Sequence, residues 1–164
     1  MRKKILIAIL ILGLMFYLHA DALASGTGNQ TISVTISAIN EISISGNPGG
    51  LIVGTASAGS NPNPVSDSTT SYHLTTNGSS KKITGQLDAT MPDYTTLTVN
   101  LTAPSGGTSA GDVALNSSAA NLVTGITRSR GSALGITYTF AATVEAGIVA
   151  STSRTVTFTI IDGP

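Results

Sequence analysis

Few residues of this chain could do acid–base or nucleophilic chemistry. Cysteine is absent, and His73 is the only histidine outside the apolar N-terminal stretch. His73 alternates out of phase with the apolar Tyr72 and Leu74, so we expect an exposed imidazole without catalytic partners. Serines are abundant, but a Ser-His-Asp triad can be drawn through any serine-rich chain. We therefore predict no catalytic residues and no enzymatic activity.

The sequence offers candidate residues for two kinds of binding site, a calcium site and a glycan site. Calcium binds carboxylates of this kind at loops, and the expected loops carry Asp67, Asp88, Asp93 and Asp112. None of them stands in a loop of the D-x-[DN]-x-[DN]-G pattern. We expect solvated aspartates, with no metal and no other cofactor. Glycan-binding sites usually contain an exposed aromatic ring on which the sugar stacks. Tyr94 in MPDYTT is the one candidate for such a ligand contact. The alternative for Tyr94 is a loop ring packed on the rim of the fold.

The N-terminus predicts export. Arg2, Lys3 and Lys4 precede an apolar run from Ile5 to Leu18, and Ala22-Leu23-Ala24 supplies small residues for cleavage. We expect residues 1–24 to be a signal peptide and residues 25–164 to form a single domain, secreted to the periplasm, the cell surface or the medium. No membrane association is expected after cleavage.

The expected mature chain carries few charges. It has five basic and seven acidic residues, a net charge of −2, and no basic patch with interleaved aromatics. Nucleic acid is therefore not an expected partner. Scattered charges among Ser, Thr, Asn and Gly suit dense packing against copies of the same protein. Without disulfides, stability must come from core burial and strand pairing.

Apolar residues recur at every second position through most of the mature chain. The clearest alternating stretches are 72–76, 97–101, 134–144 and 156–160, and a short apolar run stands at 51–53. Asn77-Gly78 is the best hairpin signal, and residues 54–68 the longest loop signal. This pattern predicts an all-β fold: an antiparallel, immunoglobulin-like β-sandwich of about 8–9 strands.

The mature chain opens on its longest alternating stretch, NQTISVTISAINEISIS, residues 29–45. Ile32, Val34 and Ile36 share one face, the phase slips near residues 38–41, and Ile42 and Ile44 resume it. The slip predicts a bulge or a bend between sheets, which favours a first strand of the protein's own sandwich. The other hypothesis is a strand lent to a neighbour, with Ile32, Val34 and Ile36 as the strand-exchange segment. Residues 30–45 hold one charge, Glu41, and no proline to prevent such pairing.

A resemblance bears on this choice. The stretch GITYTFAATVEAGIVASTSRTVTFTI, residues 135–160, resembles the terminal hairpin of bacterial fimbrial subunits, including those of the spore-coat-U type. The alternating stretch after the expected signal peptide is similar in placement to a pilin donor strand. The resemblance implies an exported immunoglobulin-like subunit that polymerises and has no enzymatic activity.

The sequence thus predicts a structural or adhesive surface protein, a self-assembling fimbrial or envelope subunit. Its expected partners are copies of itself or other envelope proteins. The alternative is a periplasmic or extracellular binding module for a glycan or a metal ion.

Overall fold

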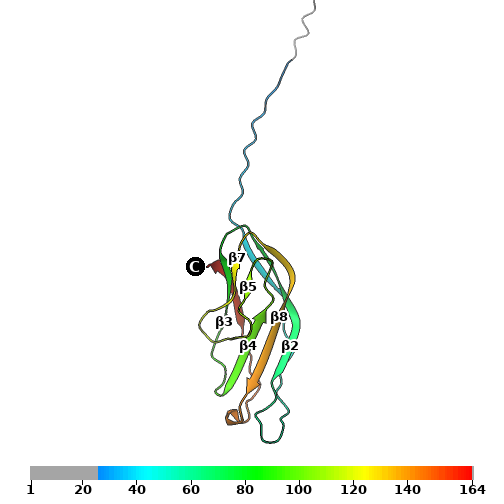
Figure 1. Ribbon diagram of the computed structural model, residues 1–164, viewed down its shortest axis with the longest axis vertical. Coiled ribbons are helices and arrows are strands. Elements are labelled where there is room, and N and C mark those ends of the chain that lie inside the picture. Colours follow the sequence, from blue (N-terminus) through cyan, green and yellow to red (C-terminus); the bar gives the residue numbers. More distant parts are fainter. Residues whose placement is uncertain (1–25, 164) are drawn as a thin grey trace, which may run out of the picture. The chain divides into compact units, whose positions relative to one another are not determined.

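Nine strands form two antiparallel sheets in the computed structural model, which describes residues 26–163 (Figure 1). The five-stranded sheet has the order β1 (Asn40–Ser45), β2 (Val65–Thr76), β8 (Arg130–Ala142), β4 (Thr95–Leu101), β6 (Val113–Ala114). The four-stranded sheet has the order β5 (Thr108–Ser109), β7 (Ala120–Ile126), β3 (Lys81–Leu87), β9 (Val156–Asp162). One turn of 3-10 helix, η1 (Val144–Ala146), follows β8. The prediction of an all-β, antiparallel fold in two layers is confirmed; the expected signal peptide lies outside the described residues.

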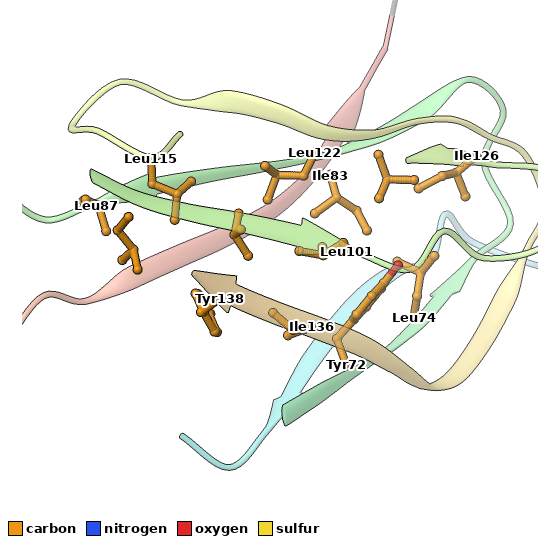
Figure 2. Packing of buried hydrophobic residues seen from close by; sticks show 13 residues of the cluster. Tyr72, Leu74, Ile83, Leu87, Leu101, Leu115, Leu122, Ile126, Ile136 and Tyr138 are labelled. Atoms are coloured by element: carbon orange, nitrogen blue, oxygen red, sulfur yellow. The ribbon is translucent and has the colours of Figure 1, made fainter. Parts of the chain in front are cut away.

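The core lies between the two sheets and comes from the predicted alternation. Leu97, Val99 and Leu101 of β4 are buried, while Thr98 and Asn100 between them are more exposed. Figure 2 shows side chains of both sheets meeting in one cluster, with Tyr72 and Ile136 on one side and Ile83 and Leu122 on the other. Because every second residue of a strand points to the same face, a period of two in the sequence is sufficient to build this cluster.

Tyr72 and His73 take the places predicted for them. Tyr72 is fully buried, and its hydroxyl donates a hydrogen bond to the Thr102 carbonyl at 2.5 Å. His73 is exposed on the opposite face of β2, where its Nδ1 accepts a hydrogen bond from the Ala133 amide at 3.4 Å. Nδ1 also lies 3.1 Å from the Ser132 hydroxyl.

Three predicted elements are wrong. Asn77-Gly78 does not close a hairpin, because β2 and β3 belong to different sheets. Residues 51–53 form no strand, although Leu51 packs against the core cluster. Strand β2 begins at Val65, inside the predicted loop, because Val65–Asp67 pair with β8 and the Ser66 and Thr139 hydroxyls are hydrogen bonded at 2.7 Å. Long-range pairing here prevails over the local turn signal.

The opening stretch is a strand in its second half only. Asn40–Ser45 forms β1 and pairs with β2, from Asn40 opposite Thr76 to Ser45 opposite Ser71. Residues 26–39 form no strand, so a bulged strand through the phase slip is wrong; β1 begins where the slip occurs. The chain divides at this region into one compact unit that begins at Ile36 and a separate unit that ends at Thr35.

The two core tyrosines make stability fall at alkaline pH. Burial raises the pKa of Tyr72 and of Tyr138 to about 12. In the unfolded chain both ionise near pH 10, so between pH 10 and 12 the unfolded state binds fewer protons than the folded state. We therefore expect Tm to fall through this range. Tyr138→Phe should flatten the profile, with Tyr94→Phe as an exposed control. Identical slopes of Tm against pH for Tyr138→Phe and the unsubstituted protein would contradict a raised pKa of Tyr138.

Candidate assembly site

The N-terminal segment, residues 26–36, exposes apolar side chains. Ile32, Val34 and Ile36 have exposed fractions of 75%, 88% and 86%. They alternate with Ser33 and Thr35, and the segment contains no charged residue. In an extended conformation all three would point to one side, so the segment presents one apolar face and one polar face.

Asn77 holds the chain where this segment joins the sandwich. Its Oδ1 accepts a hydrogen bond from the Ile39 amide at 2.8 Å, and its Nδ2 donates one to the Ser37 carbonyl at 2.8 Å. Its own amide donates to the Ile39 carbonyl at 3.2 Å. The two side-chain bonds are worth about 0.5–1.5 kcal/mol each. We call residues 37–39 the neck and these three bonds the Asn77 clamp.

Strand β9 lies at the edge of its sheet. It pairs with β3 on one side, from Leu87 opposite Val156 to Lys81 opposite Asp162, and with no strand of residues 26–163 on the other. Val156, Phe158 and Ile160 alternate along it, pack against the core cluster and stay half-exposed. The edge therefore leaves both backbone groups and apolar side chains incompletely covered. The Asp162 end of β9 lies at the Asn77 end of the sandwich, since the Gly163 amide donates to the Ser80 carbonyl at 2.6 Å.

The other sheet edges within the described chain are better protected. The edge strands β5 and β6 have two residues each. Strand β1 has six residues but carries Glu41, whereas the seven-residue β9 has no charge before its last residue, Asp162. Proteins usually protect an edge by shortness, charge or proline. The interior of β9 has none of these, and so it is the edge best suited to accept a further strand.

Strand β9 also lies at the margin between the two sheets, beside β1. Strands β1 and β9 approach each other but do not pair. Ile42 of β1 is half-buried against the same core cluster as Phe158. We call β9 together with Ile42 the open margin. A strand added there would complete the β9 ladder and cover apolar surface from both sheets.

Tyr94 lies at a different place, beside a hollow of about 410 Å³. The ring is 63% exposed, and the residue has a φ of 59°, in the left-handed region. Its carbonyl accepts a hydrogen bond from the Thr143 amide at 3.0 Å, which helps to hold this unfavourable backbone. Further lining comes from Thr96 and from the segments Ser60–Pro64 and Ala141–Thr143. The exposed ring is accessible to a ligand, and a role for Tyr94 as a ligand contact stays a prediction.

Several charged groups of residues 26–163 are held by local hydrogen bonds or by an ion pair. The pKa of Asp67 is lowered by hydrogen bonds from Thr69 and then from the Gly49 amide, and that of Glu145 by a hydrogen bond from Thr143. Lys81 and Asp162 form an ion pair that joins the ends of β3 and β9. Among residues 26–163, no three His, Asp or Glu side chains gather in a metal-binding cluster.

One motif outside the sequence predictions has the spacing of a nucleophile elbow. Residues 107–111, GTSAG, match G-x-S-x-G. An elbow needs a sharp turn from a strand into a helix, whereas Ser109 lies in the two-residue β5. Its hydroxyl donates to the Asn100 side chain at 3.4 Å and accepts from the Gly111 amide at 3.2 Å. The motif is therefore a tight connection between short strands.

Comparison of the chain with protein-family models, curated proteins and solved structures gave no match. Within residues 26–163, no helix is long and apolar enough to cross a membrane.

Sequence reasoning found the N-terminal segment and Tyr94, but it missed the Asn77 clamp and the open margin. Asn77-Gly78 was interpreted as a hairpin, because a turn motif does not reveal which distant segment its side chain binds. Residues 156–160 were predicted to alternate as a strand, and Val156, Phe158 and Ile160 do pack against the core cluster. The alternation could not reveal that β9, the strand that contains them, lies at the edge of its sheet.

Phe158→Ala should cost less stability than a true core truncation. Removing a fully buried Phe costs about 3–5 kcal/mol, and Phe158 is only half-buried. We expect about 1–3 kcal/mol by urea denaturation of the monomer. Leu101→Ala, at a side chain only 1% exposed, should cost about 2–5 kcal/mol and serves as the comparison. A larger loss for Phe158→Ala than for Leu101→Ala would contradict an open margin.

Proposed function

We propose that this chain is a non-enzymatic, exported structural subunit that assembles with copies of itself by strand donation. In this proposal, residues Gln30–Ile36 of one copy add to the free edge of β9 in another copy. The donated strand places Ile32, Val34 and Ile36 over the open margin. The location follows from the expected signal peptide, and the fimbrial or envelope class follows from the resemblance of residues 135–160.

The observation that carries the proposal is the match between an unpaired segment and an unpaired edge. Donor and acceptor are each seven residues long, about 23 Å when extended. Each has three apolar residues at alternate positions: Ile32, Val34 and Ile36 on the donor, Val156, Phe158 and Ile160 on the acceptor. Adding a strand satisfies backbone groups along the whole edge, and alternate side chains supply the apolar contact.

The sheet orders support an immunoglobulin-like interpretation. The series β1-β2-β8-β4 corresponds to strands A-B-E-D of an immunoglobulin sandwich, and β3-β9 corresponds to C-F. Strand G of that fold pairs with F on the side away from C. No described strand occupies this place beside β9. The donated segment would act as strand G and complete the sandwich.

Removing the donor should give a monomer that accepts it back as a peptide. A variant that lacks residues 26–36 keeps all nine strands, so we expect a folded monomer by size-exclusion chromatography. A synthetic peptide of residues 29–38 should bind it and raise Tm. A hundredfold excess of peptide over its Kd stabilises by about 2.7 kcal/mol. An unchanged Tm at millimolar peptide would contradict strand donation.

A charge on the apolar face of the donor should block assembly. Val34→Asp would bury an unpaired carboxylate in the open margin, which is strongly unfavourable. We expect negative-stain microscopy to show few or no assemblies for this variant. Ser33→Asp, next to it on the polar face, is the matched control and should assemble normally. Equal assembly of both variants would contradict the assigned faces.

The exposed ring and the hollow favour a second candidate, a glycan-binding site at Tyr94. A sugar ring could stack on the Tyr94 ring while Asn61 and Asn63 offer amide groups beside it. Tyr94→Ala should abolish binding of any glycan that the protein retains on an array, and Tyr138→Phe should leave it intact. An array without hits for the unsubstituted protein would exclude this candidate.

A further inference from the structure

We infer that the Asn77 clamp makes strand donation intermolecular, by preventing the N-terminal segment from folding back onto β9 of its own chain. This inference rests on the proposed function. Asn77 is then a positioning residue that decides between a polymer and a self-closed monomer.

Folding back is a real competitor, because the neck and the last residues of β9 meet at the same turn. The neck is bound to the β2–β3 turn at Asn77, and the last residues of β9 reach the same turn through Gly163 and Ser80. A segment that reversed at the neck would therefore lie beside its own β9. A tethered strand has a high effective concentration, so intramolecular closure would win unless something opposes it.

The neck opposes the reversal by its backbone conformation. Tight reversals of two or three residues commonly use residues with positive φ, as the short turns of β-hairpins do. Among the described residues, none of Ser37, Ala38 and Ile39 has a positive φ. The Asn77 side chain bonds to backbone groups on both sides of Ala38, so it fixes this backbone conformation of the neck.

The residues before the neck oppose a reversal as well. Thr31, Ile32, Val34, Thr35 and Ile36 are all β-branched, and such residues favour extended backbone. The nearest Gly or Asn upstream is Asn29. A turn there would come too early and leave only three described residues to pair with β9.

Strand direction also favours donation of the segment to β9 of another copy over pairing with β9 of its own chain. A segment that folded back from the neck would run parallel to its own β9, because its Ile36 end would lie at the Asp162 end. A segment from another copy that arrives from the Val156 end runs antiparallel to β9. Antiparallel ladders are slightly more stable per residue. Such head-to-tail donation leaves a free donor and a free acceptor at the two ends, so it generates an open filament.

Engineered cysteines test the inference, because the chain has no cysteine of its own. Ser33→Cys places a thiol on the polar face of the donor, and Thr157→Cys or Thr159→Cys places one on the exposed face of β9. Opposed residues on neighbouring strands are close enough for a disulfide. After oxidation of the full chain, purified from the exported fraction, a non-reducing gel separates interchain ladders from intrachain monomers.

We expect ladders with Asn77 present and a several-fold shift to fast-migrating intrachain monomers with Asn77→Ala. Asn77→Asp keeps the acceptor for the Ile39 amide and should give an intermediate ratio. Ser79→Ala, exposed in the same turn, should behave like the unsubstituted chain. Thermal melts show which variants are folded.

A four-residue Gly-Ser insertion between Ile36 and Ser37 keeps the clamp but supplies a turn. It too should shift the chain to intrachain bonds.

The outcomes separate the two proposals. Ladders that persist unchanged in Asn77→Ala and in the insertion variant would overturn the role of the neck and leave strand donation standing. Absence of disulfides between donor and β9 in every background would overturn strand donation and, with it, this inference. If intrachain bonds already dominate with Asn77 present, the inference about the neck is overturned, whereas pairing between the donor segment and β9 is not.

Discussion

A strand at the edge of a sheet leaves half of its backbone groups without partners, and the rest of this structure depends on how each edge meets that constraint. The five-stranded sheet ends in β1, which carries Glu41, and in the two-residue β6. The four-stranded sheet ends in the two-residue β5 and in β9. Of these, β9 is the longest, and its interior is uncharged. Among the edges of the described sheets, that of β9 is therefore the least protected.

The core explains why the fold tolerates an open edge. Thirteen apolar side chains are buried between the sheets, and the largest ones come from strands other than β9. β9 adds Val156, Phe158 and Ile160 to the border of this cluster. The sandwich therefore has a sufficient core of its own, and a strand added at the margin would extend that core.

The sequence was sufficient to predict the fold class, because strand alternation is a local signal that survives in any arrangement of the sheets. Buried Tyr72 and Leu74 beside exposed His73 illustrate this. Strand order is not local. Asn77-Gly78 carries a turn signal, yet the chain passes there from one sheet to the other. For the same reason, the open margin could not be predicted: Phe158 has the sequence of an ordinary final strand, and its exposure depends on which strands are its neighbours.

The clamp also decides how a pulling force would travel through the molecule. Tension on residues before Ile36 reaches the sandwich first at Ser37 and Ile39, and their bonds to Asn77 pass part of it directly to the end of β2. The remainder loads the ladder between β1 and β2, six residue pairs that a pull along the strand axis must shear together. Since β2 also pairs with β8 at the centre of its sheet, the load spreads over the five-stranded sheet and bypasses β9. The free edge of β9 and the end of the chain held by Asn77 are thus mechanically separate parts of one small domain.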